Sequence, residues 1–293
     1  MIKEQNIDII LYSTFGKIAT ITLNRPSVFN AINMEMPGLL KKYIEKANED
    51  ENIRVIILQG AGKAFCSGYD LKLFAETPRP CPGSQSMPWD PIKDYQFMNY
   101  CTDCYMSIWR SIKPVICKIR GPAVGGGSDI ALCCDQVFAT NDSRIGYPPA
   151  RLWGVPTTFM WVYRLGIEKA KSILFVGELL NGKKAKEIGL IGDSFETEKD
   201  LDDHVQNLAE KMSQIPLNQL AMIKLTINQV YENMGLKSTQ LLATILDGIA
   251  RHTPEGCAFK RRCEEVGFKQ AIYERDTNPE LLLKEINKTK AKF

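Results

Sequence analysis

The sequence has few histidines, no long apolar stretch and little net charge, and each shortage excludes a class of function. Only two of the 293 residues are histidine, so neither a histidine-based catalytic triad nor a histidine metal site is expected. The 37 basic and 34 acidic residues leave a net charge of +3, which does not indicate binding to nucleic acid or to a membrane surface. No apolar run approaches the roughly 20 residues that span a membrane.

Two nucleotide-binding patterns, GxGxxG and GxxxxGK[ST], are also missing. Residues 1–8 lack the apolar core of a signal peptide. Nine cysteines are scattered along the chain, and the only CxxC pair is Cys101 with Cys104. We therefore expect reduced thiols, a cytoplasmic protein and no metal site.

The first two thirds of the sequence alternate short apolar segments with amphipathic ones. Residues 7–23 predict a β-hairpin around Phe15-Gly16, and the later strands are expected at 55–58, 114–119 and 136–140 and around Ile145. Helices are expected at 33–48 and 94–112, and from residue 200 onward helical patterns follow one another, the last at 254–275. The chain thus divides into an α/β core, residues 1–199, and a helical region, 200–293, that packs on the core and on a neighbouring subunit.

The most unusual local feature is three glycines in a row, Gly125 to Gly127, between an apolar segment and a short helical pattern that carries Asp129. Each glycine costs roughly 0.5–1 kcal/mol of backbone entropy relative to alanine. One explanation is bare backbone at the start of a helix, where unpaired N–H groups favour a negative charge such as a developing oxyanion. The other is a tight strand-to-helix turn without chemistry.

A second loop of small residues, Lys63 to Lys72, leads into a predicted helix with Asp70 as its N-cap. The following segment, residues 76–91, contains five prolines and is expected to be a long loop. Long loops within a compact domain often cover a binding site.

These segments resemble, in order and spacing, the crotonase superfamily, also called the enoyl-CoA hydratase/isomerase family, over about residues 5–275. The similar motifs are Ile18–Pro26 with Phe29–Ile32, Arg54–Gly60, Ala64–Leu71, Lys113–Ile116, Gly121–Asp135 and Ala185–Ile191. The resemblance implies an α/β fold, a spiral of repeated ββα units with a C-terminal helical oligomerisation region. It also implies a homotrimer or dimer of trimers that binds an acyl-CoA thioester, with no separate cofactor because CoA is part of the substrate.

The resemblance also implies the catalytic residues. The backbone N–H groups of Tyr69 and Gly126 would form an oxyanion hole for the thioester oxygen, and Asp129 stands where hydratases of this family carry their first catalytic glutamate. The implied substrate-binding residues are Arg25 and Lys72 near the CoA phosphates, Ala64, Cys66 and Leu71 in the loop, and Tyr147, Arg151 and Trp153. Phe259 and Lys260 are candidates to reach the CoA site of a neighbouring subunit.

The sequence departs from the family pattern at the second catalytic glutamate, whose place is taken by Pro149. No acidic residue lies between Asp142 and Glu168, although adding water to an enoyl thioester needs both a base and an acid. Arg151 is a candidate to bind a substrate carboxylate or to lower the pKa of Asp129. Asp90, Asp94 and Tyr95 are candidates for the missing acid.

The leading hypothesis is an enoyl-CoA hydratase/dehydratase-type lyase that stabilises a thioester enolate and has a non-standard second acid. An enoyl-CoA isomerase is the first alternative. A decarboxylase or thioester hydrolase that acts on a carboxylated acyl-CoA is the second, with Arg151 holding the carboxylate. A non-catalytic acyl-CoA-binding protein is the third.

Overall fold

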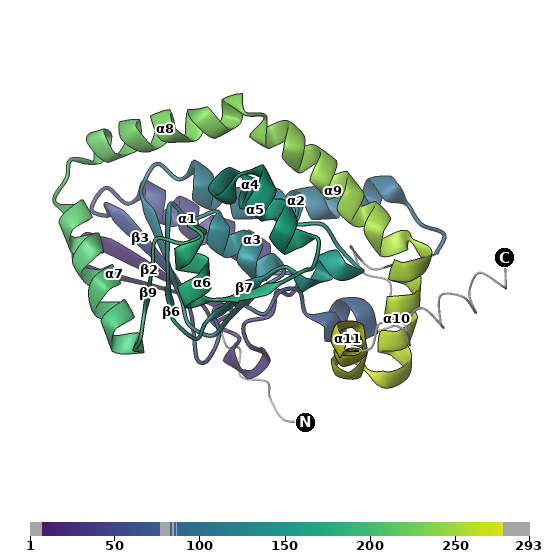
Figure 1. Ribbon diagram of the computed structural model, residues 1–293. Coiled ribbons are helices and arrows are strands. Elements are labelled where there is room, and N and C mark those ends of the chain that lie inside the picture. Colours follow the sequence, from purple (N-terminus) through teal and green to yellow (C-terminus); the bar gives the residue numbers. More distant parts are fainter. Residues whose placement is uncertain (1–7, 77–82, 84, 86, 278–293) are drawn as a thin grey trace, which may run out of the picture.

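The computed structural model describes residues 8–76, 83, 85 and 87–277. A six-stranded sheet lies on the left-hand side of Figure 1. The first two strands pair antiparallel as the predicted hairpin, and every later neighbour pairs parallel. In sheet order the strands are β1 (Ile10–Phe15), β2 (Ile18–Leu23), β3 (Val55–Gly60), β4 (Val115–Ile119), β6 (Gln136–Thr140) and β9 (Asp193–Phe195). The apolar run in β3 is buried because both faces of the sheet are covered.

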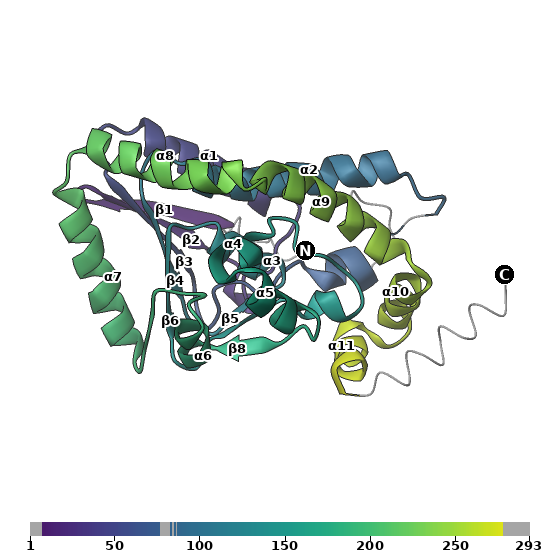
Figure 2. The ribbon, with the colours of Figure 1, turned by 45° about the horizontal axis from the view of Figure 1, so that its top comes forward.

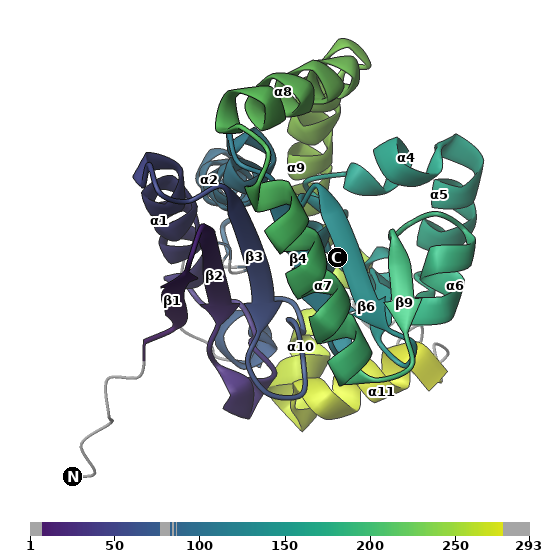
Figure 3. The ribbon, with the colours of Figure 1, turned by 90° about the vertical axis from the view of Figure 1, so that its left-hand side faces the viewer.

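Helix α7 (Glu198–Ser213) covers one face of this sheet (Figure 3). Its apolar residues Leu201, Val205 and Ala209 are spaced four residues apart and therefore share one side of the helix. They pack against sheet residues that include Val55 and Phe138. Burying one such Val, Leu or Phe side chain contributes about 1.5–3 kcal/mol.

The opposite face of the sheet carries the main hydrophobic core, over which the remaining elements lie. A second, three-stranded sheet has the order β5-β7-β8. The elements are α1 (Met36–Glu49), α2 (Pro91–Arg110), β5 (Pro122–Val124), α3 (Gly126–Leu132), β7 (Arg144–Gly146), α4 (Met160–Leu165), α5 (Ile167–Leu174), β8 (Leu179–Asn181) and α6 (Gly182–Glu187), with short helical turns η1 (Pro26–Val28), η2 (Lys72–Glu76) and η3 (Pro148–Arg151).

The last four helices run along the molecule and then turn back to the core (Figure 2). Helices α8 (Leu217–Asn233) and α9 (Leu236–His252) form a long arm, and α9 packs beside α2. Helices α10 (Pro254–Val266) and α11 (Phe268–Thr277) then pack against η2. The C-terminal region therefore covers the core of its own chain. No helix within the described residues is both long and apolar enough to cross a membrane.

The predicted hairpin, later strands and helices are confirmed, with three corrections. The helix expected over 254–275 is two helices, because Gly267 has a φ of 81°, which ends α10. Asp70 is not a side-chain N-cap, since its carboxylate binds Arg25 and its carbonyl accepts the first bonds of η2. The three-residue strands β5, β8 and β9 were not predicted, because such short segments carry no periodicity. Half of the predicted loop 76–91, residues 77–82, 84 and 86, lies outside the described residues.

Candidate active site

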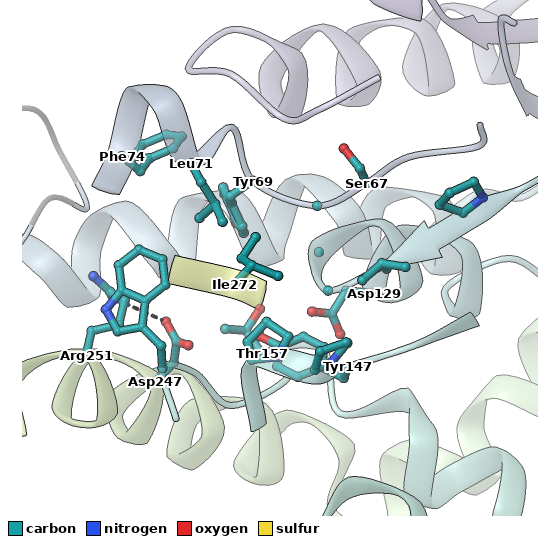
Figure 4. Close-up of a pocket in the computed structure, with 18 of the residues that line it drawn as sticks. Ser67, Tyr69, Leu71, Phe74, Asp129, Tyr147, Thr157, Asp247, Arg251 and Ile272 are labelled. Carbon is teal, nitrogen blue, oxygen red and sulfur yellow. Dashed lines mark hydrogen bonds and ion pairs between the residues drawn. The ribbon is translucent and has the colours of Figure 1, made fainter. Parts of the chain in front are cut away.

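A cavity of about 300 Å³ opens between the Tyr69 loop, the glycine triplet and the C-terminal helices (Figure 4). Its wall is largely apolar and aromatic. Leu71, Phe74, Phe97, Met98, Val124 and Ile272 are among the apolar residues that line it. The polar groups in the wall include two buried carboxyl groups, those of Asp129 and Asp247. An apolar cavity with a few convergent polar groups is typical of a small-molecule site.

The predicted oxyanion-hole residues lie side by side. Cys66 pairs with Ala123 as an isolated β-bridge, and the Cys66 amide donates to the Pro122 carbonyl at 2.9 Å. This bridge holds the Tyr69 loop against the strand that precedes the glycine triplet. Neither the Tyr69 nor the Gly126 backbone amide donates a hydrogen bond to another described residue. Both N–H groups are therefore available to an oxygen atom in the cavity.

The structure gives each glycine of the triplet a local reason. Gly125 has φ 57° and ψ −127°, a conformation that residues with a Cβ avoid. A Cβ on Gly126 would stand 2.8 Å from Ile32 and 3.0 Å from the ring of Tyr69. A Cβ on Gly127 would collide with the carbonyl oxygen of Cys66. The bare backbone thus lets the two loops approach each other closely.

Asp129 follows the triplet on α3 and is 2% exposed. Its Oδ1 accepts a hydrogen bond from the Thr158 hydroxyl at 2.6 Å. Burial raises the pKa of Asp129 from 3.8 to about 7, because removal from water penalises the charged form; the Thr158 hydrogen bond opposes this rise and the charge of Asp247 adds to it. A carboxyl group with a pKa near 7 can both give and take a proton at neutral pH.

Pro149 lines the cavity beside the glycine triplet, 3.6 Å from the point where a Cβ on Gly125 would stand. Its side chain therefore forms part of the cavity wall but carries no acidic group. Tyr147 and Trp153, both predicted to bind substrate, also line the cavity. The Tyr147 hydroxyl donates to the Val155 carbonyl at 3.0 Å, and the Trp153 indole N–H donates to Gln85 at 2.7 Å.

The other predicted substrate-binding residues are Leu71, Ala64, Cys66, Arg25 and Lys72, and they differ in how close they lie to the cavity. Leu71 lies in the cavity wall, whereas Ala64 and Cys66 are buried in the loop that positions the Tyr69 amide. Arg25 is occupied by the fold, because it donates to the Ala31 carbonyl at 2.5 Å and to Asp70 at 3.0 Å. Lys72 is exposed at the start of η2. Contact of Arg25 or Lys72 with CoA stays a prediction.

The roles considered for Arg151 are not supported. Its guanidinium donates to the Val176 carbonyl at 2.8 Å and to Asp276 at 2.7 Å, and Arg151 is not part of the cavity wall. It is also not among the groups that set the pKa of Asp129. The guanidinium of Arg151 is therefore held by these two contacts near the surface.

The candidates for a second acid in the 76–95 segment are also corrected. Asp90 caps α2 by accepting from the amides of Ile92 and Lys93, and Tyr95 is half-buried on that helix, outside the cavity wall. Only Asp94 points inward, and it binds Arg251 at 2.9 Å from outside the cavity wall.

Phe259 is fully buried in its own chain, where its ring lies 5.3 Å from that of Trp153. It is therefore not available to a neighbouring subunit. Lys260 bonds to Glu264 at 2.6 Å on the same helix.

Two residues of α9, Asp247 and Arg251, line the cavity and were not predicted. Asp247 is 4% exposed, and its Oδ2 accepts from Arg251 Nε at 3.2 Å. An acid and an arginine four residues apart on a helix were visible in the sequence. Their burial was indicated only by the apolar neighbours on that face, Ala243 and Gly248.

Comparison with known proteins places this chain in a family. The family model described as enoyl-CoA hydratase/isomerase matches residues 14–258. The chain belongs to the enoyl-CoA hydratase/isomerase family. The crotonase fold class and an acyl-CoA enzyme, both expected from the resemblance, are thereby confirmed.

Proteins similar to this chain are named for different reactions, hydration and isomerisation. It is 31% identical to (E)-benzylidenesuccinyl-CoA hydratase of Thauera aromatica, covering 81% of this chain and 89% of the relative. It is 28% identical to 1,2-epoxyphenylacetyl-CoA isomerase of Escherichia coli, covering 78% and 84%. The structure of an enoyl-CoA hydratase from Mycobacterium smegmatis superposes with a TM-score of 0.84 at 39% identity, covering 92% and 94%. Family membership therefore leaves the choice between lyase and isomerase open.

Proposed function

We propose that this protein is an enoyl-CoA hydratase/dehydratase-type lyase, which adds water to an enoyl-CoA or removes it from a 3-hydroxyacyl-CoA. The observation that carries the proposal is the position of Asp129. Its buried carboxyl group, whose pKa is about 7, lines the same cavity as the Tyr69 and Gly126 amides.

In the proposed reaction the thioester oxygen accepts hydrogen bonds from both amides. These donors stabilise the negative charge that gathers on the oxygen as the enolate forms, and in measured cases one such donor contributes about 3–4 kcal/mol. Asp129 carries the proton to or from the substrate carbon. The low polarity of the surrounding wall strengthens these interactions because it excludes water.

An isomerase is the second candidate, and a specific observation favours it. Pro149 leaves its part of the wall without an acid, and moving a double bond requires only that one group remove a proton and return it elsewhere. Asp129 alone satisfies that need. The decarboxylase or hydrolase alternative loses the carboxylate contact assigned to Arg151, because this residue binds Asp276 and is not part of the cavity wall.

Mass spectrometry of reactions in deuterated water separates the two candidates. A hydratase gives a product that is heavier than the enoyl-CoA by one molecule of deuterated water. An isomerase gives a product that has gained no water and whose mass rises only by the deuterium incorporated at carbon. Crotonyl-CoA, longer enoyl-CoA and aryl-substituted enoyl-CoA thioesters form the substrate set. Binding of all of them without turnover, measured by calorimetry, would refute both candidates and support an acyl-CoA-binding protein.

We also propose that the protein forms a homotrimer or a dimer of trimers through the α8–α9 arm. Eleven apolar side chains on this arm are 41–63% exposed: Met222, Ile223, Leu225, Ile227, Val230, Met234, Leu241, Leu242, Ile245, Leu246 and Ile249. So long an apolar surface is typical of a protein interface. Light scattering after size-exclusion chromatography should give a trimeric or hexameric mass, which Ile227→Asp with Leu242→Asp should reduce and Phe15→Asp, on β1, should not. A monomeric wild-type protein would refute this proposal.

A further inference from the structure

Asp247 supplies the cavity with a second carboxyl group, beside the place where the acid is missing. Oδ1 of Asp247 lies 3.0 Å from the point where a Cβ on Gly154 would stand, and the Cβ of Pro149 lies 3.3 Å from the same point. The hydroxyl oxygen of Tyr147 is 3.4 Å from it. The carboxyl group of α9 and the ring of Pro149 therefore face the same small space in the wall.

The orientation of the Asp247 carboxylate is fixed from two sides. Its Oδ1 accepts from the Val155 amide at 3.0 Å and its Oδ2 accepts from Arg251 Nε at 3.2 Å. Arg251 is held in turn by Asp94 at 2.9 Å and by the Gly83 carbonyl at 3.0 Å. Groups that must meet a substrate in one geometry are typically supported in this way.

The charges of this network do not balance. Arg251 is shared between Asp94 and Asp247, so two buried carboxylates face one guanidinium. A buried, incompletely compensated carboxylate is costly for stability, and apolar residues would fill the same space at lower cost. Such a cost is usually retained where the group serves a function. Figure 4 shows Asp247 and Asp129 pointing into the cavity from separate parts of its wall.

We propose that Asp247 is the second catalytic carboxylate, which binds the water molecule that is added to, or lost from, the substrate. This inference rests on the proposed hydratase function. In hydration the water oxygen bonds to the β-carbon, and the proton of the water passes to Asp247. The electron pair of the carbon–carbon double bond moves into the thioester enolate, held by the Tyr69 and Gly126 amides. Protonated Asp129 then gives its proton to the α-carbon, and the proton on Asp247 returns to Asp129 through solvent.

The test compares Asp247→Asn with Asp94→Asn. Both substitutions remove one carboxylate from Arg251, but only the first removes it from the cavity wall. We expect Asp247→Asn to lower kcat for enoyl-CoA hydration by about 100-fold or more, the usual contribution of a general acid or base, with little change in KM. Asp94→Asn should hydrate at least about tenfold faster than Asp247→Asn. Equal losses in the two variants would show a purely structural role and overturn the inference.

A second readout separates this inference from the proposed function. Exchange of the α-proton of an acyl-CoA with deuterated water needs the two amides and Asp129 but not the added water. Asp247→Asn should therefore retain exchange while losing hydration, whereas Asp129→Asn should lose both. A hydration rate in Asp247→Asn equal to that of the wild type would overturn the inference and leave the proposed function standing. Absence of hydration in the wild type would overturn both.

Should Asp247→Asn fail to fold, Asp247→Glu keeps the charge for Arg251 but advances the carboxylate by one methylene. We expect its hydration rate to fall at least about tenfold. An unchanged rate would overturn the inference.

Discussion

Replacing Asp129 by asparagine should inactivate the enzyme and stabilise its fold in alkaline solution. The wild-type carboxyl group has a pKa of about 7 in the folded protein and an ordinary value of 3.8. Between these values the folded state binds more protons than the unfolded state, so stability falls as the pH rises. At 1.36 kcal/mol per pH unit the full cost above pH 7 is about 4 kcal/mol. Asparagine is neutral throughout and escapes this cost.

Urea unfolding at about pH 4.5 and about pH 8 measures this effect directly. The stability of Asp129→Asn relative to wild type should increase by about 3 kcal/mol between the two conditions. At the same time kcat for enoyl-CoA turnover should fall by about 10²–10⁴, the range for loss of a general acid or base. A stability difference that does not change with pH would refute the raised pKa, and full activity would remove Asp129 from the mechanism.

Three further substitutions probe the neighbouring contacts. Gly126→Ala should reduce kcat by about 100-fold, because the added methyl group pushes the Tyr69 loop away from its partner amide; an unchanged kcat in a correctly folded variant would contradict the oxyanion hole. Thr158→Val removes the hydrogen bond that favours the ionised form of Asp129, so the pKa that governs the pH–rate profile should rise, and a fall would contradict the assigned cause. Arg151→Ala should leave kcat and KM within about threefold of wild type and cost at most about 1 kcal/mol of stability, the usual range for a partly exposed ion pair; a large rise in KM would return this residue to the site.

Features of the site that depend on local backbone geometry could be predicted from the sequence. Three consecutive glycines indicate a close approach of backbone, and the structure shows the Tyr69 loop making that approach through Cys66. The prediction succeeded because a missing Cβ has the same steric meaning in every fold. The hairpin and the later strands were predictable for a similar reason, since their apolar patterns reflect the sheet faces that they cover.

Features that depend on the direction of a long side chain could not be predicted. Arg151 lies close in sequence to the cavity residues Pro149 and Trp153, yet the turn of η3 sends its guanidinium to Asp276 on α11. Asp247 lies more than one hundred residues beyond Asp129, and the path of α8 and α9 brings it to the cavity. No sequence pattern specifies where two helices of different segments will meet.

The arm formed by α8 and α9 shows the same limit on a larger scale. Its helices were predictable from their spacing, but the arm buries only part of its apolar surface against its own chain. Which apolar positions face the core depends on the packing of α9 beside α2. Periodicity alone therefore indicates an apolar face without saying what covers it.

The most direct test of the central claim is a crystal structure with a bound acyl-CoA. We predict that the thioester oxygen lies about 2.7–3.1 Å from the backbone nitrogens of both Tyr69 and Gly126, the range for oxyanion-hole donors. The Asp129 carboxyl group should lie within hydrogen-bond reach of the reacting carbon atoms or of a water beside them. A thioester oxygen bound away from both amides would contradict the claim.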